Sequence, residues 1–409
     1  MRILIVGVKY SANLGDGVIA CCLEGALQER FPAAEVESLD LSGKTRFGGH
    51  GIGRRSSLLN QWLTSLPGRI RSLLASSMHV VASRLVLRQR WLEQVATADV
   101  IVIGGGQLFD DRDHYFPSRI GQVLDIARSR EIPVCLFAVG VTHAMTRPAR
   151  YSFARSLQRS RLEGIWARDA ASLSNFKRFF PRFDPHLCRD PGFLSHLFFE
   201  ASPQNSVEPA PPSKPRIGLC ITNPVTLRPL SGLPGGCQLD AHFYAELIAG
   251  LDEDGMDCVV FCSGLEMDQA FVGEVEAVCR RHFPRSGQRV YFAERLLSPD
   301  QMVSLISSLD GVVAQRMHPT IVAYAYRVPH VGLGWHRKLE SFFTSVGRDA
   351  FLIPPDQHEP AHVRQTLHRA LEAPISEEKH AETTAETHEG FQALASVIEQ
   401  TQLASARRH

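Results

Sequence analysis

Several features that mark other protein classes are missing from this sequence. None of its 409 residues belongs to an apolar run near the ~18 residues that a membrane-spanning helix needs. The nine cysteines are scattered without a CxxC pair, and several lie inside apolar runs, so we expect reduced core thiols and no metal site. The G-x-G-x-x-G spacing and the P-loop are also absent, which argues against a dinucleotide fold or a P-loop nucleotidase.

The chain also lacks an excess of charge of either sign. Lysine and arginine number 44 and aspartate and glutamate 43, a formal net charge of +1, so we expect no nucleic-acid partner. A 44% hydrophobic and 21% charged composition is that of a globular chain, and the length suggests more than one domain. The opening segment MRILIVGV is too short for a signal peptide, so we read it as a strand and expect a cytoplasmic protein.

One region lacks acidic residues altogether. Residues 41–92, here called the basic insertion, lie between Asp40 and Glu93 and place basic residues among leucines and two tryptophans: Lys44, Arg46, Arg54, Arg55, Arg69, Arg71, Arg84, Arg88 and Arg90. A basic amphipathic segment can lie on an anionic membrane surface, here the cytoplasmic face of an inner membrane, or hold a lipid-linked acceptor. The alternative is a helical flank that packs on a sheet with solvated arginines.

What the sequence does contain is a repeated pattern of short apolar runs with helical segments between them. Runs such as RILIVGV, VIVIGGG and VCLFAVGV are typical of strands buried on both faces of a parallel sheet. The pattern starts again after the Pro/Ser-rich stretch at 200–215. We therefore predict an α/β protein with two tandem Rossmann-like, doubly wound domains: residues 1–199 with the basic insertion, the 200–215 linker, residues 216–374, and a final helix over 375–409.

The turn after the first predicted strand carries the sequence SANLGDG. In a doubly wound domain this turn lies at the carboxyl edge of the sheet, where ligands bind, so Asn13 and Asp16 are candidate site residues. The alternative is that Asp16 only caps the following helix. Farther along, Gly105 and Gly106 follow a strand and let the backbone approach a ligand, while Arg168 ends another strand, facing the cleft or pairing with a carboxylate.

The strongest concentration of positive charge is in AQRMHPTIVAYAYRVPHVGLGWHRKLE, residues 314–340. We predict a strand over 310–315 and a helix with Pro319 in its first turn, which places Arg316 and His318 at the helix N-terminus. Arg337 and Lys338 follow the next strand and reach the same edge of the sheet. Bare N–H groups, a guanidinium, an imidazole and an ammonium together suit a phosphate or a carboxylate, or one small ligand carrying both.

These motifs, in this order, resemble the polysaccharide pyruvyl transferase family. The resemblance covers NLGD after the first strand, GGG after a middle strand, ARD with a serine soon after it, the R-x-H pair with its small-residue helix, and the lysine after a VP-led strand. It implies a fold like that of the two-domain (GT-B-like) glycosyltransferases. It also implies transfer of pyruvate from phosphoenolpyruvate to two hydroxyls of a sugar, forming a cyclic ketal in surface or exopolysaccharide biosynthesis.

By this resemblance Arg316, His318 and Lys338 hold the donor. From their places at the strand ends we also expect Arg337 and Arg168 to bind the donor, and Asn13, Asp16, Gly105 and Gly106 to bind the acceptor. His318 is the expected acid and Asp16 the expected base. Phosphoenolpyruvate is then a co-substrate, with no further cofactor and no metal. Two alternatives stay open: a glycosyltransferase that uses a nucleotide-activated sugar, and a non-catalytic subunit of an envelope polysaccharide assembly complex.

Overall fold

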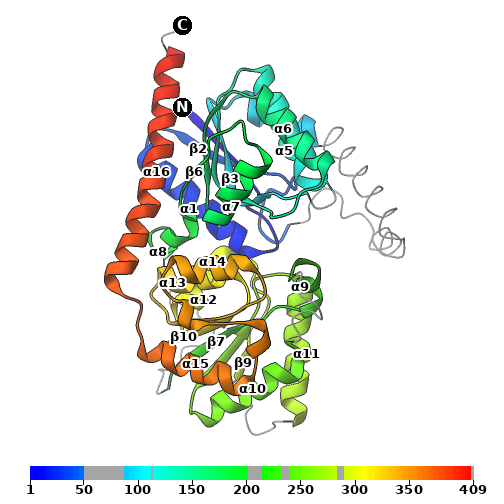
Figure 1. Ribbon diagram of the computed structural model, residues 1–409, viewed down its shortest axis with the longest axis vertical. Helices are drawn as coiled ribbons and strands as arrows, with labels where there is room; N and C mark the ends of the chain where they lie inside the picture. Colours follow the sequence, from blue (N-terminus) through cyan, green and yellow to red (C-terminus); the bar gives the residue numbers. More distant parts are fainter. Residues whose placement is uncertain (50–86, 112–113, 201–213, 232–238, 283–289, 407–409) are drawn as a thin grey trace, which may run out of the picture. The chain divides into compact units, whose positions relative to one another are not determined.

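The structure, a computed structural model, describes residues 1–49, 87–111, 114–200, 214–231, 239–282 and 290–406. These residues form two compact units (Figure 1). Unit 1 comprises Met1–Ser11, Ile19–Pro191 and Glu386–His409, and unit 2 comprises Ala12–Val18 and Gly192–Ala385. Both units therefore combine segments that are far apart in the sequence.

Unit 1 is built on a six-stranded sheet in which all paired strands are parallel. Its spatial order is β2 (Glu35–Asp40), β1 (Arg2–Gly7), β3 (Val100–Phe109), β4 (Val134–Val141), β5 (Leu162–Ala167) and β6 (His186–Leu187). The central strands are buried along almost their whole length, as expected for a sheet covered on both faces. This order, which reverses direction beside β1, is that of a doubly wound domain.

Helices cover both faces of this sheet. α1 (Leu14–Arg30) follows β1, and the other connecting helices are α4 (Arg88–Ala96), α5 (Tyr115–Ser129), α6 (Arg147–Arg159) and α7 (Ala170–Phe179). The largest core of the unit joins alternate strand residues, among them Leu4, Val6 and Ile103, to residues of these last four helices. The alternation follows from the period of two in a strand, which sends neighbouring side chains to opposite faces.

The last helix, α16 (Glu377–Ala406), contributes its residues from Glu386 onward to unit 1. Phe391 lies against Phe137 of β4, with ring centroids 5.0 Å apart. Arg189 forms an ion pair with Glu386 at 2.5 Å, and Arg30 of α1 pairs with Glu399 at 2.6 Å. This helix therefore helps to cover the face of the sheet that Phe137 presents.

Unit 2 repeats the design with a second parallel six-stranded sheet. Its order is β12 (Leu352–Ile353), β11 (His330–Leu333), β10 (Gly311–Ala314), β7 (Arg216–Cys220), β8 (Asp257–Phe261) and β9 (Val290–Phe292). One core packs α10 (Ala241–Glu253), α11 (Glu266–His282) and α15 (Pro360–Glu372) on the sheet, and another joins α13 (Met317–Ala325) to α14 (Arg337–Ser345). Its described part also contains α8 (Ser195–Phe198), α9 (Pro224–Ser231) and α12 (Pro299–Ser307).

The turn that follows β1 belongs to unit 2. The backbone N–H of Leu14 donates to the carbonyl oxygen of Ser263 at 2.9 Å. Next to it, Gly264 adopts φ +100°, and a Cβ there would lie 2.6 Å from the carbonyl oxygen of Ala12. Only glycine allows this backbone conformation and this close approach without strain, so the residue type fixes how the 12–18 segment packs.

The structure confirms the predicted fold class of two parallel, doubly wound α/β sheets. The basic insertion lies largely outside the described residues, although its two ends are described. Near its start Lys44 donates to the carbonyl oxygen of Tyr10, and near its finish Trp91 of α4 is buried in the core of unit 1. The eight cysteines of the described segments are free thiols, and burial raises the pKa of Cys135 to about 12. Among the described helices, none is both long and apolar enough to span a bilayer.

The Phe137–Phe391 contact predicts that α16 stabilises unit 1. Phe391→Ala removes a largely buried ring and is expected to lower the free energy of unfolding by about 3 kcal/mol, measured by chemical denaturation. Leu403→Ala is the matched control, because Leu403 lies on the same helix but is 62% exposed. Equal effects of the two substitutions would contradict this role for α16.

Candidate active site

Two neighbouring strands of unit 2 end in cationic turns. β10 and β11 pair in parallel, with Ala314 opposite Gly332, so the residues after each strand share one edge of the sheet. Arg316 is the N-cap residue of α13, and His318 and Pro319 lie in its first turn, as predicted. An arginine side chain has no acceptor with which to cap the first N–H groups of the helix, so their partial positive charge adds to that of the guanidinium.

The turn after β11 adds a second set of polar groups. His336 is the N-cap residue of α14, and its Nδ1 accepts the backbone N–H of Lys338 at 3.1 Å. Arg337 and Lys338 therefore open α14 at the same edge of the sheet as Arg316. Trp335 donates from its indole N–H to the carbonyl oxygen of Gln315 at 2.5 Å, which ties the two turns together.

A buried carboxylate fixes Arg316. Asp268, in the first turn of α11, has no exposed side-chain surface, and its Oδ2 lies 2.8 Å from Nη2 of Arg316. Its Oδ1 accepts the backbone N–H of Asn223 at 3.0 Å. A buried carboxylate held in this way restricts the guanidinium to one orientation, since leaving either charge unpaired would be costly. The sequence analysis did not identify Asp268.

The turn after β1 lies against His318. A Cβ on Gly15 would sit 2.3 Å from Nδ1 and 2.4 Å from Cβ of His318, so the imidazole touches the backbone of Gly15. Beside it, the side-chain amide of Asn13 donates to the carboxylate of Asp16 at 3.3 Å. The predicted acceptor residues Asn13 and Asp16 thus share unit 2 with four of the predicted donor residues: Arg316, His318, Arg337 and Lys338. Gly15 is a further residue that the sequence analysis did not assign to the site.

The other predicted residues lie in unit 1. Arg168 follows β5, and its side chain is only 3% exposed. It donates to Oε1 of Gln107 at 3.2 Å and forms ion pairs with Asp169 at 3.4 Å and Asp190 at 3.5 Å. Of the two interpretations of Arg168, pairing with neighbouring carboxylates is therefore the one observed. Its contact with the donor stays a prediction.

The glycine run of β3 has a clear structural requirement. A Cβ on Gly104 would lie 1.9 Å from the carbonyl oxygen of Phe137 on the paired strand β4. Gly105 and Gly106 adopt φ of +71° and +130°, and the β3–β4 register shifts between Gly106 and Phe109. The glycines therefore lie within β3, and the irregularity of the ladder follows them, between Gly106 and Phe109. An acceptor contact at Gly105 or Gly106 stays a prediction.

His358, Glu359 and His362 form an HExxH pattern, the spacing of a common zinc site. The prediction of no metal site did not take this pattern into account. That pattern binds zinc when both histidines lie on one helix face. Here α15 begins only at Pro360, Glu359 is its N-cap residue, and Nε2 of His358 contacts the carbonyl oxygen of Ile353 at 3.1 Å. Across the described residues no cluster of three or more potential metal ligands occurs.

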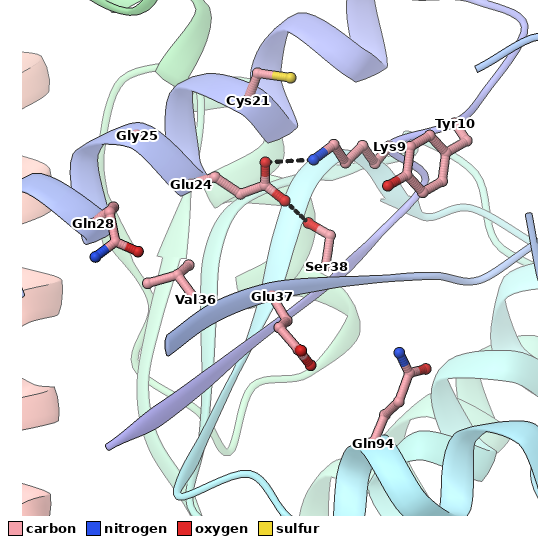
Figure 2. A pocket seen from close by; sticks show the side chains of 10 residues that line it. All are labelled: Lys9, Tyr10, Cys21, Glu24, Gly25, Gln28, Val36, Glu37, Ser38 and Gln94. Atoms are coloured by element: carbon pink, nitrogen blue, oxygen red, sulfur yellow. Dashed lines mark hydrogen bonds and ion pairs between the residues drawn. The ribbon is translucent and has the colours of Figure 1, made fainter. Parts of the chain in front are cut away.

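A polar hollow of about 560 Å³ lies between α1 and β2 in unit 1 (Figure 2). Its one lysine, Lys9, is neutralised by Glu24, with Nζ 2.5 Å from Oε2, and Ser38 also donates to Glu24. Burial alone would lower the pKa of Lys9, but the hydrogen bond and charge of Glu24 outweigh it and raise the pKa. A lysine engaged in this way is a poor anion ligand, and the hollow contains none of the predicted site residues.

Several solved enzyme structures share this fold. The chain is similar to a UDP-forming α,α-trehalose-phosphate synthase from Burkholderia xenovorans at 13% identity and TM-score 0.54, covering 99% of this chain and 98% of that one. It is also similar to a UDP-GlcNAc 2-epimerase from Methanocaldococcus jannaschii at 9% identity and TM-score 0.54, covering 93% and 94%. The spinosyn forosaminyltransferase shows 15% identity, TM-score 0.52 and coverage of 98% and 99%. At these identities the likeness establishes the GT-B-like two-domain fold alone.

Sequence comparison goes further than fold. No curated protein sequence matches the chain. The sequence profile described as "Polysaccharide pyruvyl transferase", however, matches residues 13–337, a span that runs from the turn after β1 to the first residue of α14. This match covers most of the chain and contains Arg316, His318 and Gly15, which touches His318. The chain therefore belongs to the polysaccharide pyruvyl transferase family.

Proposed function

We propose that the protein transfers the pyruvate of phosphoenolpyruvate onto two hydroxyls of a sugar, forming a cyclic ketal during polysaccharide biosynthesis. The observation that carries this proposal is the placing of Arg316 and His318 at the start of α13, with His318 touching Gly15, which lies between Asn13 and Asp16. The cationic helix start, the imidazole and the segment that bears the Asp16 carboxylate thus belong to one unit.

Phosphoenolpyruvate carries a carboxylate and a phosphate on a small enol. The N-terminus of α13 and the guanidinium of Arg316 suit one of these anions, while Arg337 and Lys338, at the end of the adjacent strand, suit the other. Asp268 acts on the donor only through Arg316, because its carboxylate is fully buried and bonded to that guanidinium. We therefore regard Asp268 as a positioning residue.

The chemistry needs a proton at the methylene carbon of the enol. His318 donates it, which makes C2 electrophilic, and one sugar hydroxyl attacks C2 while Asp16 accepts its proton. The C2–O bond to phosphate breaks and phosphate leaves with the electron pair of that bond. The second hydroxyl then attacks C2 and closes the ketal, and its proton returns to His318, which had given one to the methylene carbon. Two C–O bonds form at C2, and the products are the ketal and inorganic phosphate.

Three further assignments belong to this proposal. In unit 1, Arg168 contributes to donor binding, and Gly105 and Gly106 contribute to acceptor binding. The acceptor is a free sugar or a lipid-linked oligosaccharide. The protein works in the cytoplasm, with the basic insertion against the cytoplasmic face of the inner membrane, a contact supported by the absence of acidic residues between Asp40 and Glu93.

The place of Arg316 at the helix start predicts that its guanidinium contributes to the affinity for the donor. Arg316→Ala removes the guanidinium and is expected to weaken phosphoenolpyruvate binding by roughly 2 to 4 kcal/mol, measured by titration calorimetry. Because this variant leaves the buried carboxylate of Asp268 unpaired, an Asp268→Asn/Arg316→Gln variant is the control for folding. If both variants keep full donor affinity while folded, Arg316 does not bind the donor.

We expect the loss of His318 to lower turnover rather than donor binding. His318→Gln keeps a polar side chain of similar length but cannot deliver a proton, so kcat is expected to fall about a hundredfold or more while donor binding persists. Steady-state kinetics and calorimetry on the same preparation separate the two effects. Turnover within a few fold of the parent enzyme would mean that the proton comes from another group.

The contact between Gly15 and His318 predicts that displacing the imidazole lowers kcat. In Gly15→Ala the new methyl group overlaps both the ring and Cβ of His318, so kcat is expected to fall at least tenfold. Gly273→Ala on α11 is the matched control, because a Cβ there meets no atom within 4 Å. Unchanged kcat in Gly15→Ala would show that the contact has no role in catalysis.

A further inference from the structure

A second polar hollow lies in the helical layer of unit 1. It has a volume of about 420 Å³ and runs between α5 and α6, which pack side by side (Figure 1). One wall carries Tyr151, Arg155 and Arg159 of α6, and the other carries Gln122 and Asp125 of α5. No part of the proposed transfer reaction uses these residues.

The α6 wall presents two cations and an aromatic ring in a row. Tyr151, Arg155 and Arg159 are four residues apart in turn, so they lie along one face of the helix. Tyr151 is 68% exposed, which is unusual for so large a ring. Within the described segments neither arginine forms an ion pair, so both guanidinium groups have their donors available to a ligand.

The α5 wall supplies acceptors. Gln122 is only 8% exposed, lines the hollow, and its buried Oε1 has no hydrogen-bond partner in the described part of the chain. An unsatisfied buried amide oxygen is costly, so a ligand hydroxyl that reaches it would be favoured. Asp125 and the hydroxyls of Ser118, Ser152 and Ser156 add further polar atoms. Sugar hydroxyls both donate and accept, which suits this mixture.

The hollow begins at the ligand-binding edge of the sheet. His114, the N-cap residue of α5, and Pro148, at the start of α6, line one end of it. These two helices follow β3 and β4, so they start at the carboxyl edge, where the irregular end of β3 after Gly106 also lies. Asp125 and Arg159 lie farther along the same helices, so the hollow leads away from that edge.

We propose that this groove holds a stretch of an acidic glycan, a sugar chain that carries carboxylate groups. The two guanidinium forks bind carboxylates, the Tyr151 ring packs against the C–H face of a sugar ring, and Gln122, Asp125 and the serines bond to hydroxyls. A flat bilayer does not enter a concave groove, and a polyphosphate has neither hydroxyls for Gln122 and Asp125 nor a C–H face for Tyr151.

The inference rests on the proposed function only in taking the acceptor as part of a longer sugar chain. Binding is therefore measured without phosphoenolpyruvate, so a failure of the transfer reaction and a failure of the groove give different results. The probes are a β-1,4-mannuronate hexamer and the neutral β-1,4-mannohexaose, which differ in the carboxylate. Calorimetry gives the affinity, and hydrogen exchange of α5 and α6 gives the location.

We expect the intact protein to prefer the mannuronate hexamer and to gain exchange protection over α5 and α6. Arg155→Gln/Arg159→Gln is expected to weaken this binding about tenfold, and Tyr151→Ala to weaken both hexamers. The control Arg147→Gln/Arg150→Gln removes the same charge from exposed positions of the same helix that do not line the groove, and it is expected to change affinity less than twofold.

Three outcomes would overturn the proposal. Equal losses in the two arginine pairs would mean that general charge, not the groove, attracts the ligand. Equal affinity for the two hexamers, or binding of neither, would exclude an acidic glycan. Competition by vesicles of anionic phospholipid that depends on Arg147 and Arg150 would assign the face of α6 to a membrane surface instead.

Discussion

The ion pair between Asp268 and Arg316 is the constraint on which the candidate site depends. It joins the first turn of α11 to the N-cap of α13 at 2.8 Å, with the carboxylate completely buried. Such a pair does little for net stability, but it is costly to break, so it selects one arrangement of its neighbours. Because Asp268 also accepts the N–H of Asn223, the guanidinium, α11 and the segment after β7 are held in one hydrogen-bonded unit. The cation at the helix start is thereby placed before any ligand arrives, which lowers the cost of ordering it on binding.

Much of the fold could be predicted because buried parallel strands have a strong signature. β1, β3 and β4 are continuous apolar runs, and so are β7, β8 and β10 of the second sheet. β2 was not predicted from the sequence because it lies at the edge of its sheet, where Glu35 and Glu37 pair with Arg2 instead of facing a core. β6 and β12 are two residues long, too short for any periodicity. The sequence also did not predict that the turn after β1 belongs to unit 2. This packing depends on a backbone hydrogen bond from Leu14 to Ser263, which any residue type could form.

The candidate site, like the fold, could be predicted from the sequence only in part. Arg316, His318 and Lys338 could be grouped from sequence because adjacent parallel strands must end at one edge of a sheet. Asp268 could not, because it lies 48 residues from Arg316 and looks like an ordinary acidic residue in the first turn of a helix. Gly15 was visible only as a member of a glycine-containing turn, and its contact with His318 depends on packing. The HExxH letters at His358 show the converse, since a spacing has its chemical meaning only when both histidines lie on a helix, and α15 starts after the first of them.

The distribution of arginines explains how a chain of net charge +1 can be organised around anions. Arg168 and Arg316 are largely buried and each is matched by a carboxylate, so they add little to the long-range field but a great deal of local geometry. Arg155 and Arg159 lie instead on an outer helix, where no carboxylate of the described segments pairs with either, so water screens them and a ligand must supply the opposite charge. The first arrangement suits a small donor that must be held in one pose for chemistry. The second suits a long, variable ligand that needs to be held in register but does not react where it is held. An enzyme that modifies a polymer needs both, and the two kinds of site place opposite demands on the same residue type.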